Sequence, residues 1–246
     1  MLSITPDTRA VLVELFAAHT RQRVIIDAVL EKGHGQAIAD SLSAPQVALL
    51  TLADFAIPAG NPDHPLARAL VEALSPGLIV PASAAWRRLV LQVHGAKISI
   101  QPRVELSPEK LELTRLRQLA QRIPEGYQIC RIDLEMAPRA MGHLAYASAA
   151  EFIDKGIGYC ALWQGEPVSR IRSYIDGNKT IEISIITDPE HQGKGLATAT
   201  GAALLTHCLE RGIEAHWNAT NPISVRLAER LGYVHNGSFE LLVLEK

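Results

Sequence analysis

Apolar residues along the first half of the chain follow two spacings, one typical of helices and one typical of strands. Thr8 to Thr20 repeats its apolar positions every three or four residues and predicts an amphipathic helix. Val24 to Leu30 and Val47 to Phe55 are short, nearly continuous apolar runs and predict strands. Helix and strand patterns continue to alternate up to Val104, so we expect an N-terminal α/β domain, in which no chemical motif stands out.

A break in this pattern separates the two halves of the chain. After Pro108 the apolar residues recur on one face of a predicted helix. That face comprises Leu113, Leu116, Ala120 and Ile123. The helix is followed by Pro124-Glu125-Gly126, in which proline and glycine interrupt regular structure. We therefore predict an N-terminal domain over residues 1–123 and a second domain over residues 124–246.

The second half shows a clear order of strands and helices. Strands are predicted at residues 127–133, 158–163, 167–175, 180–187, 214–219 and 239–244. Helices are predicted at residues 147–155, from the glycine-containing segment after residue 187 to Arg211, and from Asn221 to the glycine at 232. The turns Gln164-Gly165-Glu166 and Asp176-Gly177-Asn178 join consecutive strands as hairpins. The pattern predicts a sheet flanked by helices.

The composition is that of an ordinary globular protein, with 48% hydrophobic and 20% charged residues. The formal net charge is −2, and the densest basic cluster, Arg115, Arg117 and Arg122, is too small for a nucleic-acid surface. No apolar run approaches the roughly 20 residues that span a bilayer, and no positively charged leader precedes the first apolar residues. We expect a cytoplasmic protein without nucleic-acid or membrane partners.

The spacing of cysteine and histidine does not indicate a metal site. Cys130, Cys160 and Cys208 form no CxxC pair, and their odd number argues against a disulfide framework. The nine histidines show neither HxxxH nor HxH spacing. We therefore predict a reduced protein that uses no metal.

A pair of glycines in PEHQGKGLATATGAALL, between a predicted strand and a predicted helix, is the strongest chemical signal. A P-loop needs GxxxxGK[ST], but Asp188 stands five residues before Gly193, and Lys194 is followed by Gly195. A dinucleotide-binding fingerprint needs GxGxxG, and its third glycine position is occupied here by Thr198. Both nucleotide motifs are excluded.

The position of this turn still favours an anion. Unpaired backbone N–H groups and the positive end of the helix dipole converge at the start of a helix. Gly193 and Gly195 have no Cβ atoms to hold a phosphate away from those amides, and Lys194 adds a positive charge. The alternative is a turn that needs glycine only for its backbone dihedrals, and the glycine pair by itself is compatible with both.

The flanking residues add a resemblance. Residues 192–197, QGKGLA, resemble the [QR]xxGx[GA] pyrophosphate loop of the GCN5-related N-acetyltransferase (GNAT) family. The strand order, the NPISVRLAERLGY segment and the final hairpin are similar to that family over residues 127–246, and the whole chain looks most like the zwittermicin-resistance-type acetyltransferases. The resemblance implies a GNAT fold, with a mixed, mostly antiparallel twisted sheet, and acetyl-CoA as co-substrate without a metal.

The same resemblance implies where acetyl-CoA binds. Its pyrophosphate would lie on the loop amides, and its pantetheine arm between the strands at residues 181–187 and 214–219. The residues assigned to this site are Ile185, Ile186, Thr187, Gln192, Gly193, Lys194, Gly195, Leu196, Ala197, Thr198 and Asn221. Asn221 is also explained as a helix cap.

Acetyl transfer to an amine requires the neutral amine, and fewer than about one in a thousand lysine-like amines, with a pKa of about 10.4, are neutral at pH 7. A base is therefore useful. Glu182 lies on the strand before the loop, on the face opposite Ile181 and Ile183. Glutamates at this place act as base in the family, so we nominate Glu182. There are two alternatives for Glu182: it is a solvated carboxylate without a catalytic role, or it only holds an ammonium group of the substrate.

The general acid is where the sequence departs from the family pattern. Many members carry a tyrosine seven residues after the asparagine of this segment, and here that position is Ala228. His216 and Ser224 are nominated as catalytic substitutes, and Tyr233 is considered but is better explained as a core residue. A thiol of pKa about 8.5 is also a fair leaving group without help.

We therefore predict an acetyl-CoA-dependent N-acyltransferase that acetylates a primary amine of a small molecule, such as an antibiotic or metabolite, by direct attack. A protein N-acetyltransferase and an acyl-CoA-binding sensor without catalysis are the alternatives. The N-terminal domain is expected to serve the substrate pocket or an interaction. The sequence does not identify the acceptor, and it gives no sign of a homo-oligomer.

Overall fold

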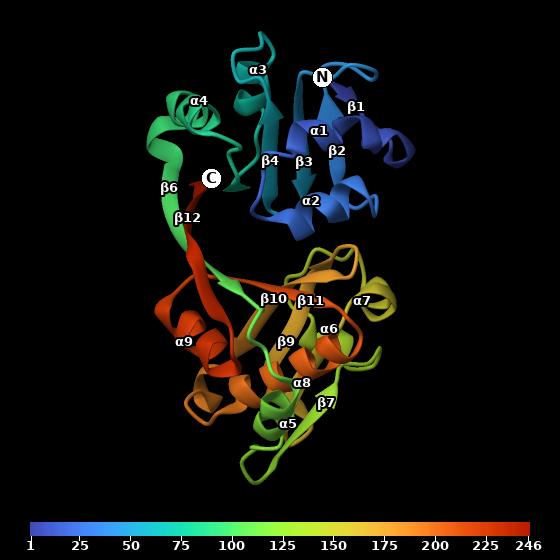
Figure 1. The fold of residues 1–246 in the computed structure, drawn as a ribbon, viewed down its shortest axis with the longest axis vertical. Helices are drawn as coiled ribbons and strands as arrows, with labels where there is room; N and C mark the ends of the chain where they lie inside the picture. Colours follow the sequence, from blue (N-terminus) through green and yellow to red (C-terminus); the bar gives the residue numbers. More distant parts are fainter. The chain divides into compact units, whose positions relative to one another are not determined.

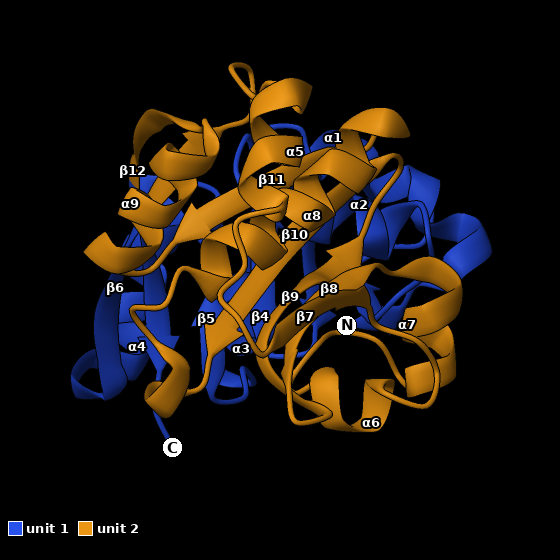
Figure 2. Ribbon diagram, turned by 90° about the horizontal axis from the view of Figure 1, so that it is seen from below, with its two compact units in different colours: residues 1–103, 239–246 blue, residues 104–238 orange.

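The computed structural model describes residues 1–246 and divides into two compact units (Figures 1 and 2). The first unit comprises residues 1–103 and 239–246, and the second comprises residues 104–238. Strands β6 (Ile98–Ser107) and β12 (Val234–Leu244) each run from one unit into the other. The end of the chain therefore belongs to the first unit, although the residues just before it belong to the second.

The predicted domain boundary falls inside the second unit. Helix α5 (Leu113–Ala120), which precedes that boundary, packs along α8 (Leu196–Glu210). Leu116 on the predicted apolar face is fully buried in this contact, so the one-sided helix is confirmed. A compact unit is defined by its contacts and a domain by its ability to fold alone. The domain boundary between residues 123 and 124 therefore stays a prediction.

The first unit is built on a sheet in the order β1-β2-β3-β4-β5-β12. Its other strands are β1 (Leu2–Ser3), β2 (Gln36–Ala39), β3 (Val47–Leu52), β4 (Phe55–Gly60) and β5 (Gly77–Ile79). Neighbouring strands are antiparallel except β4 and β5. The helices are η1 (Pro6–Leu12), α1 (Val13–Phe16), α2 (Arg23–Leu30), α3 (Ala67–Glu72), α4 (Ala84–His94) and η2 (Gly95–Lys97).

The strand predicted at Val24 to Leu30 is wrong, because these residues form α2. A short apolar run that is buried on nearly all sides fits a helix as well as a strand, and periodicity does not separate the two. The helix predicted at Thr8 to Thr20 is found only in part, as the 3₁₀ turns of η1 followed by α1. The run from Val47 to Phe55 contains the whole of β3, the turn that follows it and the first residue of β4.

The second unit contains the sheet order β6-β11-β10-β9-β8-β7. Its strands include β7 (Tyr127–Arg131), β8 (Gly158–Trp163), β9 (Glu166–Asp176), β10 (Thr180–Thr187) and β11 (Glu214–Ala219). The further helices are α6 (Ala137–Ala140), α7 (Ala149–Lys155), η3 (Pro189–His191) and α9 (Pro222–Leu231). All pairs are antiparallel except β10 and β11, so the predicted mixed, mostly antiparallel sheet flanked by helices is confirmed.

Helices lie on both faces of this sheet. Ile171 of β9 is buried in the core beneath α8, whereas its neighbour Arg172 donates a hydrogen bond to the carbonyl of Ala140 in α6 at 2.9 Å. Neighbouring residues of a strand point to opposite faces, so α8 and α6 cover opposite faces of β9.

The parallel strands β10 and β11 are paired over only three residues each. Thr180, Ile181 and Glu182 pair with residues 214–216. Beyond Glu182, β10 stays paired with β9 only, and residues 217–219 of β11 pair only with β6, on the edge of β11 away from β10. The two strands therefore diverge after Glu182 and leave backbone groups unpaired between them.

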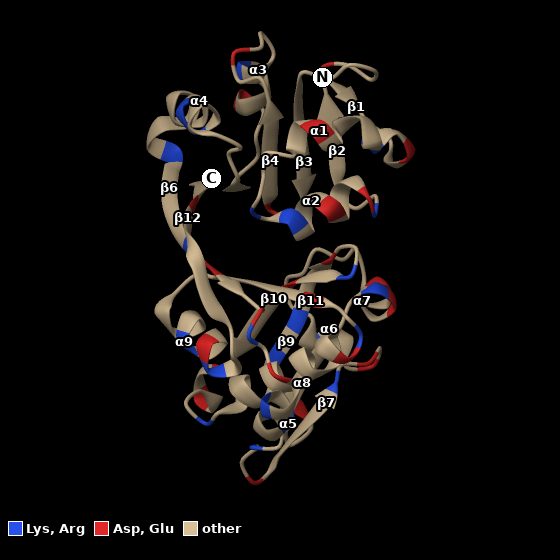
Figure 3. Cartoon of the chain, viewed as in Figure 1, with Lys and Arg blue, Asp and Glu red and all other residues tan.

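Charged residues of both signs are interspersed along the elements of each unit (Figure 3). Within the densest basic cluster, Arg117 pairs with Glu210 at 2.7 Å and Arg115 donates to the carbonyl of Arg230 at 2.8 Å. None of the helices combines the length and the apolar character that crossing a lipid bilayer requires.

His19 gives the first unit a testable pH dependence. Its side chain is 5% exposed, stacks on Phe16, and has Nε2 3.2 Å from the carbonyl of Pro58. Burial lowers its pKa below the ordinary value of 6.5. Unfolded His19 therefore binds a proton at a higher pH than folded His19, and stability is lost as the pH falls below about 6.5.

Replacing His19 by glutamine is expected to reduce the slope of the free energy of unfolding against pH, below about pH 6.5, by at most about 1.4 kcal/mol per pH unit. Burial also lowers the pKa of His207, but that residue is unchanged in the variant, so the difference between the two proteins isolates His19. Urea unfolding at neutral and mildly acidic pH measures the effect. An equal loss of stability in both proteins on acidification would show that His19 is not responsible.

Candidate active site

The glycine pair forms an open turn between β10 and α8. Gly193 and Gly195 have φ values of 76° and 82°, in the left-handed region where a residue with a Cβ is strained. A Cβ built on either glycine would meet no heavy atom within 4 Å. Backbone conformation, rather than packing, requires glycine here, and the space above the turn is free.

Five consecutive backbone N–H groups in this turn, those of residues 193–197, have no acceptor within the protein. Gly195 is the N-cap of the 15-residue helix α8 and provides no capping side chain. Helices α4, α7 and α9 differ, because Ser83, Ser148 and Asn221 accept hydrogen bonds from their first turns. Free amides at the positive end of a long helix form a site that suits an anion such as a phosphate.

Side chains hold the turn from both sides. Gln192 Nε2 donates to the carbonyl of Thr187 at 3.0 Å. Lys194 Nζ donates to Tyr127 Oη at 3.1 Å, and the Tyr127 hydroxyl lies 2.8 Å from His191 Nδ1. Tyr127 packs in turn on Trp163, with ring centroids 4.7 Å apart. The ammonium group of Lys194, a residue of the turn itself, is therefore held by Tyr127 of β7.

Glu182 lies where β10 and β11 begin to diverge. Glu182 is only 8% exposed, and Asn218 Nδ2 lies 3.1 Å from each of its carboxylate oxygens. His216 is its register partner on β11, so both side chains are on one face of the sheet. His216 Nε2 lies 3.0 Å from Glu214 Oε1. Two nominated residues, Glu182 and His216, are thus neighbours.

Asn218 and Glu105 complete a polar strip that sequence reasoning did not assign to the site. Asn218 pairs in register with Glu105 of β6, and we call Glu105, Glu182, His216 and Asn218 the polar strip. A hollow of about 130 Å³ lies over part of it, and Ser107 and Asn236 also line that hollow. Alternation along β11 is enough to place Asn218 on the face of His216, but the contact of β6 with β11 has no signal in the local sequence.

Ser224 lies apart from the polar strip. Its Oγ accepts a hydrogen bond from Trp217 Nε1 at 2.9 Å, and Trp217 alternates with His216, so it faces the opposite side of the sheet. Tyr233 donates to the carbonyl of Ala215 at 2.7 Å, and burial raises its pKa well above the usual range. Ala228 is fully buried in the same core. Tyr233 is thus a structural residue that keeps its proton.

The remaining residues assigned to acetyl-CoA border the turn or the diverging strands. Ile185 packs into the core beneath α8, while Ile186 on the other face is 50% exposed. Thr187 Oγ1 lies 2.8 Å from Ser169 Oγ, and Thr198 is buried in the first turn of α8. Asn221 is exposed and its Oδ1 accepts the N–H of Ser224 at 2.9 Å, as a helix cap does.

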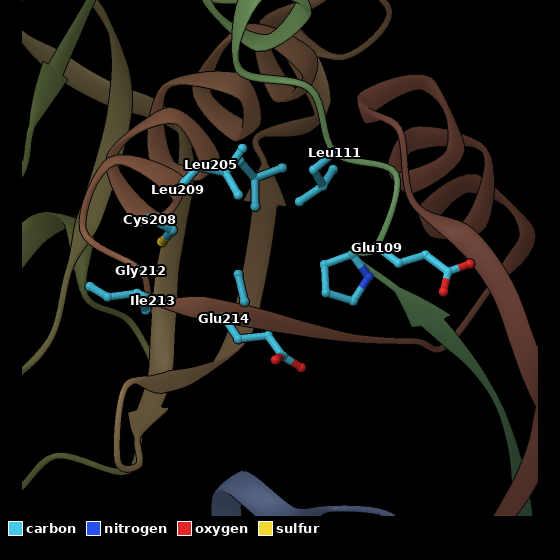
Figure 4. A pocket seen from close by; sticks show the side chains of 10 residues that line it. Glu109, Leu111, Leu205, Cys208, Leu209, Gly212, Ile213 and Glu214 are labelled. Carbon is cyan, nitrogen blue, oxygen red and sulfur yellow. The ribbon is translucent and has the colours of Figure 1, made fainter.

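A larger hollow, of about 310 Å³, lies at the opposite end of α8 (Figure 4). Leucine and isoleucine side chains supply much of its lining, and Glu109 and Glu214 stand at its edge. Its lining on α8 begins at Leu205, about 15 Å along the helix from Gly195. None of its side chains carries a positive charge, so it does not suit a phosphate. No group of three or more histidine, cysteine, aspartate or glutamate side chains is arranged to hold a metal ion.

Comparisons with known proteins agree with this fold. The model of the GNAT acetyltransferase family matches residues 13–242. A GCN5-related N-acetyltransferase-like protein from Streptococcus suis is 26% identical, with a TM-score of 0.85, over 98% of this chain and 99% of that chain. No curated protein matches the chain.

Two more distant structures share the fold. A GCN5-related N-acetyltransferase from Kribbella flavida has a TM-score of 0.59 at 14% identity, over 100% of this chain and 98% of that chain. A tandem GNAT protein from the clavulanic acid biosynthesis pathway has a TM-score of 0.65 at 13% identity, over 98% of this chain and 96% of that chain. The resemblance to the GNAT family and the GNAT fold are therefore confirmed. The chain belongs to the GNAT acetyltransferase family.

Proposed function

We propose that the protein transfers the acetyl group of acetyl-CoA to a primary amine of a small molecule by direct attack. Membership of the GNAT acetyltransferase family supports acetyl transfer in general. The observation that carries the choice of co-substrate is the row of five free amides at residues 193–197, which suits a diphosphate. The open space above both glycines and the nearby charge of Lys194 support the same assignment.

In this proposal the two diverging strands hold the pantetheine arm. The unpaired backbone groups of β10 and β11 beyond Glu182 can hydrogen-bond to the amides of an extended pantetheine. Acetyl-CoA, when bound, supplies the acetyl group as a thioester. The arm's path between β10 and β11 leads from the glycine turn towards Glu182.

Glu182 is proposed as the base. It takes a proton from the ammonium group of the acceptor, directly or through water, so that the neutral amine can attack the acetyl carbonyl carbon as the C–S bond breaks. Asn218 orients both carboxylate oxygens of Glu182. The amine nitrogen loses its second proton as the amide forms, and His216, beside Glu182, is proposed to pass that proton to the departing thiolate. Ser224 lies on the other side of the sheet, where it accepts a hydrogen bond from Trp217, and it has no direct part in this scheme.

The class of acceptor is proposed from the resemblance to zwittermicin-resistance-type acetyltransferases, which points to an amino-bearing antibiotic or metabolite. The three free cysteines suit a reducing compartment, and we propose the cytoplasm. The role of residues 1–123 in holding the acceptor stays a prediction. A sensor that binds acyl-CoA without catalysis is the second candidate, because Ala228 stands where many family members have tyrosine.

Release of free thiol from acetyl-CoA, measured with small amines, with lysine-containing peptides and without amine, tests this proposal. We expect release with at least one class of small amine. Release only with peptides would favour a protein N-acetyltransferase. Measurable binding of acetyl-CoA with no release for any amine would favour the sensor, and absence of binding would refute the co-substrate assignment.

Lys194→Met is expected to weaken acetyl-CoA binding about three- to tenfold, because one charge next to the diphosphate is lost. The difference from the wild type should shrink at high salt, which screens an exposed charge. Titration calorimetry at low and high salt measures it. Lys110→Met, at an exposed lysine outside the turn, is the control and should leave affinity unchanged. Equal weakening in both variants would mean that Lys194 has no specific role.

A further inference from the structure

Three sulfur atoms meet on the face of β7 and β8 that is turned away from α8. Cys130 and Cys160 are register partners on these strands, and their Sγ atoms are 3.6 Å apart. Met136, at the start of α6, has its Sδ 3.1 Å from Cys160 Sγ and 4.0 Å from Cys130 Sγ. We call Cys130, Met136 and Cys160 the sulfur triangle.

The dimensions of the sulfur triangle suit a three-coordinate metal ion. An ion about 2.3 Å from each of three sulfurs in one plane holds them about 4 Å apart. The observed separations are 3.1, 3.6 and 4.0 Å, and Met136 has a flexible side chain that can withdraw to widen the shortest one. The two cysteine sulfurs need to move apart by about 0.4 Å to admit the ion.

The surroundings provide both protection and access. Cys160 is fully buried, whereas Cys130 and Met136 are only partly buried, so an ion can enter from their side. Asp133 Oδ1 accepts the N–H of Met136 at 2.9 Å and fixes the backbone that positions the thioether. Arg170 of β9 is the register partner of Cys160, and its buried Nε has no hydrogen-bond partner.

We propose that the sulfur triangle is a binding site for Cu(I). Two thiolates and one thioether are a soft ligand set, which selects monovalent copper over harder ions. As the two Cu–S(thiolate) bonds form, both thiol protons leave to solvent, and the resulting centre has a net charge of −1. The guanidinium of Arg170, which also pairs with Asp188, lies on the same face of the sheet and offsets part of that charge. Copper stays in its reduced state throughout.

Zinc fits less well, because structural zinc takes four ligands and no histidine, aspartate or glutamate joins the two cysteines in a metal-binding group. The sequence predicts no metal site, because its cysteines show no CxxC spacing. CxxC spacing does not detect the sulfur triangle, because its two cysteines lie on separate strands that pair in the fold and its third ligand is a methionine.

Anaerobic titration of the full chain with Cu(I), in competition with the cuprous chelator bicinchoninate, tests the proposal. We expect one equivalent of copper per chain, and X-ray absorption that shows only sulfur neighbours, about 2.3 Å from the metal. Cys130→Ser should weaken binding by at least about 100-fold and Met136→Leu by about tenfold. Met141→Leu, at the methionine that follows α6, is the matched control and should bind as the wild type does.

Three results would overturn the proposal. One is a stoichiometry well below one equivalent for a folded chain. Another is equal affinity in the Met136→Leu and Met141→Leu proteins, with nitrogen or oxygen neighbours at the metal. The last is a mass lower by about 2 Da in air, from two thiols oxidised by O₂, in a chain that takes up no copper under reducing conditions. The copper titration does not depend on acetyl transfer.

Discussion

Gly195→Glu is expected to weaken acetyl-CoA binding by at least about 100-fold, or about 2.7 kcal/mol. The space above Gly195 is open, so the new side chain would occupy the place proposed for the diphosphate. Its carboxylate would repel the phosphates at the point where the free amides attract them. The φ of 82° adds backbone strain, which lowers stability without acting on the ligand.

Gly212→Glu is the matched control for this substitution. Gly212 follows the other end of α8, has a φ of 64°, and also has no atom within 4 Å of a built Cβ. Both variants therefore carry similar strain and the same added charge. Titration calorimetry with acetyl-CoA should show loss of binding for Gly195→Glu alone. Unchanged affinity in a folded Gly195→Glu protein would refute the assignment of the turn to phosphate.

The glycines show how far local sequence predicts a structure. The turn at Gly193 and Gly195 is predicted from local sequence. The strand before it, the two glycines and the helical run after it all lie within a few residues and indicate the same structure. Gly201 lies in the interior of α8, where glycine costs about 1 kcal/mol relative to alanine, so its small size indicates close packing. A Cβ there would lie 2.9 Å from Leu231 Cδ1 in α9 and 3.8 Å from Ile171 Cδ1 in β9. The tightest contact is thus with α9, and the packing of α8 against α9 has no signal in the local sequence.

The same limit applies to elements and to the polar strip. Strands β8 to β10 were predicted well because turn residues separate them, whereas α2 was mistaken for a strand because its apolar residues face the core on nearly all sides. Glu182 is nominated from strand alternation together with the family resemblance, and His216 as a substitute for the missing tyrosine. The hydrogen bonds from Asn218 to Glu182 depend on how β10 and β11 are placed side by side, and that register is a tertiary property.

Glu182→Gln is expected to lower turnover by about 100-fold at neutral pH, while the Michaelis constant for acetyl-CoA changes little. Glutamine keeps the shape of the side chain and can still accept a hydrogen bond from Asn218 Nδ2. It cannot take a proton from the acceptor. At neutral pH almost all of a lysine-like amine is protonated, so the loss of the base is felt most there.

The dependence of this effect on pH distinguishes a base from a residue that only holds the substrate. As the pH rises towards the amine pKa of about 10.4, the neutral amine forms in solution, and the difference between variant and wild type should shrink. If Glu182 only binds an ammonium group, the variant should instead lose affinity for the acceptor, with a pH profile parallel to that of the wild type. Glu229→Gln, at an exposed carboxylate on α9, is the control for the loss of one negative charge. A turnover deficit that stays constant over the whole pH range would remove Glu182 as the base, even if the enzyme is slow.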